Sequence, residues 1–524
     1  MNEDRLCVSM GDLSFCEGEM SSVTETVLLG RREILTDATE ITAENVLDEL
    51  SNALAVHRQN RNEIQYLWNY YRGLQDIQAK EVTTRQEINN KITVNRANEI
   101  VSWKVDYLTG EPITYISTVD DDTVRDNVNK LNRSMRTLGK QKEDQDLMKW
   151  DMICGLAYRF IEMQKSGYAP FKTYSLDPRT AFVVKSSNIR RTPMFAVSYY
   201  MKVGNTVKAP SVGANLYTAE VYEIYTDKWY FKVEDGNIVE QKPNYLRTIP
   251  IIEYPANEER QGAFEVVIPL LNMLNDLYSD RLDGLERYVQ CFLKFVNCDI
   301  DENDMNLLQT YGAIKIKSDK DLPADVDVVA TELSQTDVQT LADSVDAQIN
   351  VICGLPNRNG GSSTSDTGRA VELRDGFVTA EQRAKASETI YKESDKKALE
   401  IIFKICKATH FFDLNVEDVD SKFTRRNYEN LQSKSQVLIA MLQQDKLHPK
   451  LAFECSGMFT DPEGAYTMSM DWWEERQKLM LQQMQNMATT PSGDSNNEQR
   501  SSENTDESKE ISNPILKSAT ETNH

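Results

Sequence analysis

His and Cys, which often carry catalysis or hold metals, are scarce in this chain of 524 residues. It has only four His and eight Cys. No two Cys form a C-x-x-C pair, and none lies beside His at the spacing of a zinc finger. We therefore expect reduced, mostly buried thiols, as in a cytosolic protein, and no metal or other cofactor.

The motifs of common hydrolases and nucleotide-binding enzymes are missing as well. The chain contains no G-x-x-x-x-G-K-[ST], no G-x-S-x-G and no H-E-x-x-H. The run from Asp299 opens like a calcium loop, but Asp304 stands where Gly is required and Thr310 where a bidentate Glu is required. We expect a protein that is not an enzyme, and an enzyme with a diffuse active site stays open as an alternative.

Long apolar runs and an excess of positive charge are also missing. No stretch approaches the ~18 apolar residues of a membrane helix, and the first residues lack the pattern of a signal peptide. Lys and Arg number 59 against 82 Asp and Glu, a net charge of −23. Tight binders of duplex DNA are usually basic, so the chain as a whole is not a clamp on DNA. A passage in which DNA must not stick is compatible with this charge.

The first half of the chain changes from a helical to a strand-like pattern. Its length favours several domains over one core. Apolar spacings of three and four predict helices over 42–71, 95–108 and 143–155. Between 158 and 254, short runs rich in Val, Ile, Tyr and Phe alternate with turn pairs such as Gly204-Asn205 and Asp235-Gly236, which predicts antiparallel hairpins. The fold class is therefore α+β, mainly α.

The second half is mostly helical. The pattern predicts helices over 264–293, 336–353, 369–410, 429–445 and 462–488, and a short strand over 314–317. Residues 489–524 have few apolar side chains, so we expect disorder there. Residues 1–40 have no pattern that assigns them.

Two features of this half have both a plain and a functional interpretation. Asp276, Asp280 and Asp283 follow each other at i, i+4 and i+7, so they form one acidic stripe on the helix over 264–293. The stripe is either an ordinary solvated face or the wall of a channel for a polyanion. The Gly- and Ser-rich run 357–367 is either a connector or a functional loop, since it is longer than most connections.

Short motifs occur in a fixed order from about residue 60 to residue 405. They are YYRG (70–73), NNKI (89–92), NRA (95–97), IV (100–101), YLTGEP (107–112), CGLAY (154–158), LDP (176–178), IPIIEY (249–254), LNMLN (271–275), SD (279–280), GLP (354–356) and TGRAV (367–371). As a set, they resemble the portal proteins of tailed bacteriophages with long, non-contractile tails. Thr367 and Val371 depart from this resemblance, since the family usually has Ser and Leu there.

The resemblance implies a function in the phage particle. Portal subunits form a ring of twelve at one capsid vertex, and double-stranded DNA passes through the ring during packaging and ejection. The implied partners are the terminase large subunit, the head–tail adaptor, and the major capsid and scaffold proteins, with no membrane. The protein would assemble in the host cytoplasm and reside in the virion. Another α-rich phage structural or scaffold protein without a DNA channel stays open as the alternative.

The resemblance also implies a division of the chain by position. The expected parts are an unassigned extension (1–40), the wing (41–263), a stem helix (264–293), the clip (294–334), a second stem helix (335–356), the tunnel loop (357–367), a long wing helix with its connection (368–429), the crown (430–488) and a disordered tail (489–524).

Three sets of site residues follow from this division. The stem residues expected to line the DNA tunnel are Asp276, Asp280, Asp283 and Glu286. The expected tunnel loop consists of Asn357, Arg358, Asn359, Gly360, Gly361, Ser362, Ser363, Thr364, Ser365 and Asp366. The clip surface expected to dock the terminase and the adaptor carries Asp301, Lys315, Lys317 and Asp321.

Overall fold

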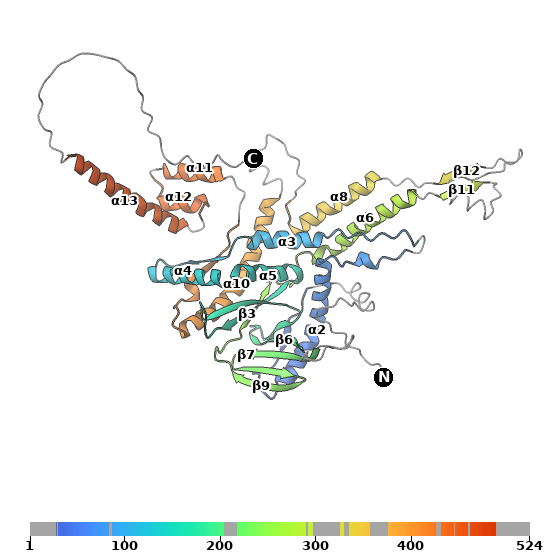
Figure 1. The fold of residues 1–524 in the computed structure, drawn as a ribbon, viewed down its shortest axis with the longest axis horizontal. Helices are drawn as coiled ribbons and strands as arrows, with labels where there is room; N and C mark the ends of the chain where they lie inside the picture. Colours follow the sequence, from blue (N-terminus) through green and yellow to red (C-terminus); the bar gives the residue numbers. More distant parts are fainter. Residues whose placement is uncertain are drawn as a thin grey trace, which may run out of the picture. The chain divides into compact units, whose positions relative to one another are not determined.

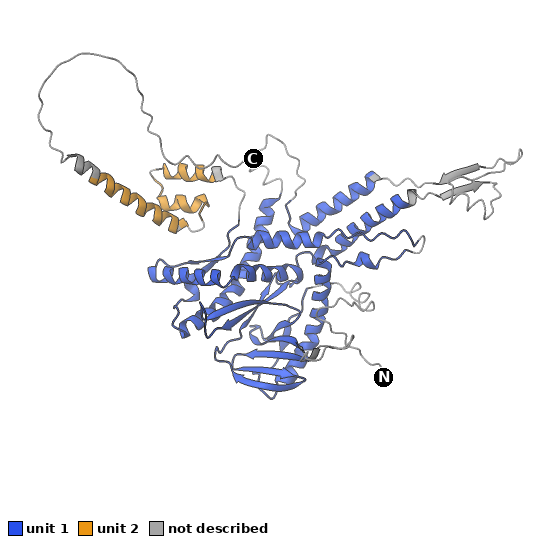
Figure 2. Ribbon diagram, in the orientation of Figure 1, with its two compact units in different colours: residues 1–431 blue, residues 432–524 orange. Residues whose placement is uncertain are grey.

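A computed structural model of the chain forms two compact units, residues 1–431 and 432–524 (Figure 2). The structure describes residues 28, 30–82, 86–203, 217–289, 292–296, 325–329, 335–356, 376–425, 431–444, 446–459 and 462–488. The mixture of helices and small sheets confirms the predicted α+β, mainly α class.

Most helices of the first unit lie where the apolar spacing predicts them (Figure 1). They are α2 (Val46–Tyr71), α3 (Arg96–Thr109), α5 (Lys140–Cys154), α6 (Ile268–Val289), α8 (Gln335–Cys353) and α10 (Phe377–Ala408). Helix α4 (Asp122–Thr137) was not predicted, although Val124, Val128, Leu131 and Met135 recur along it at spacings of three and four and face the core. Its start is stabilised by the Asp121 carboxylate, which accepts hydrogen bonds from the first N–H groups.

The predicted helix over 264–293 is wrong at both ends. A short 3-10 helix, η2 (Glu265–Val267), precedes α6, which ends at Val289. Strand β11 (Phe292–Val296) follows and pairs antiparallel with β12 (Asp325–Val329). The run of Phe, Leu, Lys, Phe and Val at 292–296 continues the apolar composition of α6, which hides the change from helix to strand. The strand predicted over 314–317 lies outside the described residues.

The β-rich region between 156 and 255, together with β1 from the N-terminal part, forms two sheets. The larger has the order β1-β5-β6-β7-β8-β9, and the smaller has the order β10-β3-β4. Their strands are β1 (Ile34–Thr36), β3 (Leu156–Met163), β4 (Phe171–Leu176), β5 (Ala181–Ser186), β6 (Pro193–Val203), β7 (Tyr217–Thr226), β8 (Trp229–Glu234), β9 (Asn237–Pro243) and β10 (Ile251–Pro255). The predicted Asp235-Gly236 turn joins β8 to β9, with φ of 50° and 75° as a type I′ turn requires. Gly204-Asn205 falls outside the described part.

Helix α2 contributes to both hydrophobic cores of this unit. Its first half, with Leu50 and Ala53, packs on the six-stranded sheet. Its second half, with Leu67 and Tyr70, packs among α3, α5, α6, α8 and α10. A last pair of strands, β2 (Thr114–Ser117) and β13 (Val419–Lys422), joins distant parts of the chain beside this second core.

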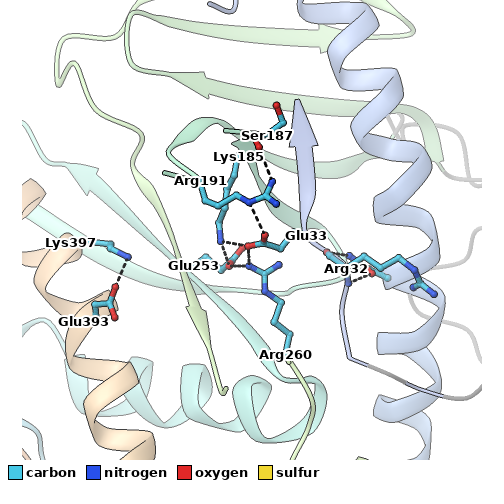
Figure 3. A network of polar contacts seen from close by, with 10 residues as sticks. Arg32, Glu33, Lys185, Ser187, Arg191, Glu253, Arg260, Glu393 and Lys397 are labelled. Atoms are coloured by element: carbon cyan, nitrogen blue, oxygen red, sulfur yellow. Dashed lines mark hydrogen bonds and ion pairs between the residues drawn. The ribbon is translucent and has the colours of Figure 1, made fainter. Parts of the chain in front are cut away.

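Part of the unassigned N-terminal extension is built into the fold. Strand β1 pairs in parallel with β5 at the edge of the larger sheet. Next to it, the Glu33 carboxylate accepts hydrogen bonds from Arg260 at 2.7 Å and from Lys185 at 3.0 Å, and both cations also reach Glu253 (Figure 3). A Cβ at Gly30 would lie 1.8 Å from the carbonyl oxygen of Glu259, so only Gly fits there.

The second unit is a small group of helices, α11 (Leu431–Leu442), α12 (Pro449–Ser456) and α13 (Pro462–Ala488). Helix α12 was not predicted. Its eight residues are too few to show a period, although Pro449 at its first position and His448, whose ring nitrogen accepts the Lys450 N–H, are typical of a helix start. Phe453 of α12 packs against the ring of Tyr466 on α13.

Candidate functional site

Helices α6 and α8 lie side by side (Figure 1). Leu271 and Leu274 of α6 share a hydrophobic core with Val345 and Ile349 of α8. Toward the end of α6, Arg281 donates a hydrogen bond of 2.6 Å to the side-chain oxygen of Gln339 on α8. The two helices therefore form one packed pair.

The start of α6 is held by a buried ion cluster. Arg31 of the N-terminal extension donates to Glu265 of η2 at 2.5 Å, and its Nε lies 3.0 Å from Glu63 of α2. The second Glu265 oxygen accepts the Gly262 N–H at 2.8 Å. Burial raises the pKa of Glu265 even though Arg31 and this N–H oppose the shift. The extension thus ties α2 to the base of α6.

One face of α6 is covered by residues 90–94, which we call the covering segment. Its alternate backbone N–H groups each donate to a side chain of α6. Val94 donates to Asn275 Oδ1 at 2.8 Å, Ile92 to Ser279 Oγ at 2.9 Å, and Asn90 to Asp283 Oδ1 at 2.8 Å. The covering segment therefore runs antiparallel to α6.

Helix geometry explains why these three side chains can serve one stretch of backbone. Positions 275, 279 and 283 follow each other at i and i+4, so they share a face of α6. Four residues of an α-helix rise about 6 Å, and two residues of extended chain span about 6.6 Å. The spacing of acceptors on α6 therefore matches the spacing of donors on the covering segment.

Other buried polar groups complete this interface. Asn275 Nδ2 donates to Gln75 Oε1 at 2.6 Å, so both ends of its amide are bonded. Tyr70 donates to Asn272, whose own Nδ2 donates to Asp76. Asn275 and Ser279 are fully buried, and buried polar groups of this kind need such partners.

The four predicted tunnel-lining carboxylates do not share one environment. Asp276 and Asp280 are exposed, Glu286 is half-buried, and Asp283 is only 2% exposed. The expected stripe of open carboxylates is therefore wrong for Asp283. Because Asp283 and Asn90 are 193 residues apart, the helical period could not reveal that the covering segment lies on this face.

Asp283 is a fully bonded carboxylate. Its Oδ1 accepts both the backbone N–H and the side-chain amide of Asn90 at 2.8 Å, and its Oδ2 accepts from Lys80 at 2.9 Å. Burial alone would raise its pKa, but the hydrogen bonds from Asn90 and Lys80 outweigh burial and lower it. Lys80 also pairs with Asp280 at 2.8 Å. At Asp276, burial and the charge of Asp280 raise the pKa.

The other predicted site residues lie outside the described residues. This holds for the tunnel-loop residues 357–366 and for Asp301, Lys315, Lys317 and Asp321 of the clip. The motif just before the loop is described. Gly354 has φ of 69°, and a Cβ there would lie 2.4 Å from Cδ of Arg383, whose guanidinium donates to the carbonyl of Ile352 at the end of α8. This packing explains why Gly stands at 354.

The sequence interpretation missed the polar residues on both sides of the contact between α6 and the segments that cover it. Gln75, Lys80, Asn90, Asn275 and Ser279 were not proposed as site residues. Three of them lie in the motifs NNKI, LNMLN and SD, which were used only for the resemblance. Their one signal in the sequence was the polar row Asn275, Ser279 and Asp283, which recurs with a period of four. The donors opposite this row are backbone N–H groups, so they leave no pattern in the sequence.

Membrane and metal sites find no support in the part of the chain that the structure describes. No helix there combines the length and apolar character that crossing a bilayer requires. No group of three or more His, Cys, Asp or Glu side chains there is arranged to hold a metal ion.

Comparisons with known proteins identify the class of this chain. The model of the family described as phage portal protein, SPP1 Gp6-like, matches residues 50–489. The chain therefore belongs to this family of phage portal proteins, which are structural components of the virion at a capsid vertex.

Individual relatives are distant. The portal protein of Bacillus phage SPP1 is 22% identical over 328 residues, which is 56% of this chain and 61% of that protein. The match thus spans about three fifths of the relative's length. A chain from a structure described as the neck of an empty GTA particle, computed with C6 symmetry, has a TM-score of 0.41 and 10% identity, and the match covers 69% of this chain and 90% of that one.

Proposed function

We propose that this chain is the portal subunit of a tailed phage. Copies of it form a ring of twelve at one capsid vertex, and double-stranded DNA enters and leaves through the ring. The family match over residues 50–489 carries this proposal, because it includes the paired helices α6 and α8. The ring assembles in the host cytoplasm with the major capsid and scaffold proteins.

The exposed carboxylates of α6 support the proposal that this helix lines the channel through which DNA slides. Asp276 and Asp280 are one turn apart and both exposed, and Glu286 lies further along the same helix. At physiological salt the screening length is about 8 Å, so a phosphate group close to such a wall is repelled. The repulsion prevents DNA from lodging in the channel. Asp283 contributes little to this wall, because its side chain is buried beneath the covering segment, and Lys80 is shared between Asp280 and Asp283.

The remaining site residues belong to the same proposal. Residues 357–366 form the tunnel loop that projects toward DNA. Asp301, Lys315, Lys317 and Asp321 belong to the clip, which docks the terminase large subunit and later the head–tail adaptor. The subunit itself hydrolyses nothing, and the terminase supplies ATP hydrolysis.

Electron microscopy of the purified full-length protein tests the proposal. We expect closed rings with a central hole wide enough for a DNA duplex. A compact monomer at every concentration, or an assembly without such a hole, would overturn the proposal and favour a structural or scaffold protein without a channel. An ATPase assay on the same sample should show no activity that a point mutation abolishes.

A further inference from the structure

The covering segment is attached to α6 along its whole length. The N–H groups of every second residue, at 90, 92 and 94, donate to side chains of α6. None of the three acceptor residues is more than 2% exposed. The segment is also held by η1 (Asp76–Ala79), where Gln78 donates to Thr93 Oγ1 at 3.0 Å and accepts from Lys91 at 2.6 Å through its carbonyl. The backbone of the covering segment and the Asn90 side chain are thus bonded to α6, and the side chains of Lys91 and Thr93 are bonded to η1.

Residues four apart on α6 lie one above the other and form a row along the helix. Only the row 275, 279 and 283 carries three side chains that can accept the hydrogen bonds, and the two adjoining rows do not. The row one residue earlier, at 274, 278 and 282, carries Leu, Tyr and Leu. The row one residue later, at 276, 280 and 284, ends in Gly, which has no side-chain acceptor. A rotation of α6 by one residue would leave at least one buried N–H group without a partner, which costs about 1–3 kcal/mol per group.

We infer that α6 and the covering segment form one composite element of the proposed stem. In this element Asn275, Ser279 and Asp283 are positioning residues that hold the segment in register. They do not face DNA. The inference rests on the proposed function only where it concerns the stem of a portal, since the attachment itself belongs to the single subunit.

Hydrogen–deuterium exchange of the purified full-length protein tests the inference. The substitution Ser279→Ala removes the acceptor of the Ile92 N–H and adds no bulk. We expect peptides that cover residues 86–95 to exchange faster by about ten-fold, as loss of one buried hydrogen bond predicts. The matched control is Ser344→Ala on the exposed face of α8, which should leave these peptides unchanged.

The outcome separates a positioning role from general support of the fold. If peptides of β6 to β8 exchange faster by the same factor as residues 86–95, Ser279 merely stabilises the unit and the inference fails. Unchanged exchange at 86–95 in Ser279→Ala also overturns it. Faster exchange confined to 86–95 supports it.

A second pair of variants tests the charged position with a conservative replacement. Asp283→Asn keeps an oxygen that can accept from Asn90, whereas Asp283→Ala keeps none. We expect protection of 86–95 to be lost in Asp283→Ala and largely retained in Asp283→Asn. Equal exchange in the two variants would contradict the positioning role. These measurements need no DNA, so a protein that forms no rings would refute the proposed function and leave this inference standing.

Discussion

Substituting Arg31 by Met gives the sharpest test of how the base of α6 is held. The side chain of Arg31 is fully buried, and that of Glu265 is 1% exposed. Met fills a similar space but has no charge, so Glu265 loses its cation. Glu63 keeps Arg32 as a partner at 2.5 Å. The substitution therefore leaves one buried carboxylate unpaired.

Removing one member of a buried ion pair typically costs about 3–5 kcal/mol, against about 0–1 kcal/mol for a surface pair. We expect Arg31→Met to lower the free energy of unfolding at pH 7 by an amount in the first range. The double variant Arg31→Met/Glu265→Gln should recover most of this loss, because no buried charge is then left without a partner. Urea unfolding of the full-length protein, followed by circular dichroism, measures both effects.

The pH dependence of Arg31→Met provides an independent check. Burial already raises the pKa of Glu265 above its ordinary value, and loss of Arg31 raises it further. The folded variant then binds more protons than the unfolded chain over a window that extends above the ordinary pKa of Glu. In that window stability falls as pH rises, so the defect should shrink on acidification. A loss below about 1 kcal/mol at pH 7, or a defect that grows as pH falls, would refute the reasoning.

Asp276→Lys/Asp280→Lys should slow or arrest DNA translocation in a packaging assay while the subunit still folds, because both side chains are exposed; unchanged packaging would place them on an outer surface. Burial lowers the pKa of His57 to about 4, so the folded protein holds this imidazole in its neutral form. The free energy of unfolding should therefore decrease as the pH falls from 6.5 to 4. In His57→Gln the melting temperature should vary less with pH over that range, and a slope equal to the wild type would contradict this assignment. Deleting residues 358–366 should leave ring assembly intact and impair packaging or DNA retention, whereas normal genome-filled heads would exclude a tunnel-loop role. Removing residues 489–524 should leave the melting temperature unchanged, because that segment has little apolar surface to bury.

Local patterns predicted elements that have a strong local cause. Helices α2, α3 and α8 were predicted because apolar residues recur along them at three and four, which is the spacing of a buried helix face. The Asp235-Gly236 turn was predicted because both positions require positive φ, which this pair adopts readily. Helix α12 was missed because it is short, and α4 was missed although four apolar residues recur along it at three and four among mostly polar neighbours.

The candidate site was predicted only in part. The period of α6 correctly placed Asp276 and Asp280 on the surface, yet it grouped Asp283 with them. Arg31 stood in a stretch without any pattern and was not assigned. Both residues owe their burial to partners about 200 residues away, such as Asn90 for Asp283 and Glu265 for Arg31.

The amino-acid sequence by itself determined the class of this protein, its α+β character and the position of α6. Those properties depend on the order of short motifs and on hydrogen bonding and packing between near neighbours in the chain. Only the tertiary structure decided which face of α6 is covered and which carboxylates stay open to solvent. The burial of a side chain depends on which distant segment packs against it, and the pattern around that side chain does not contain this information.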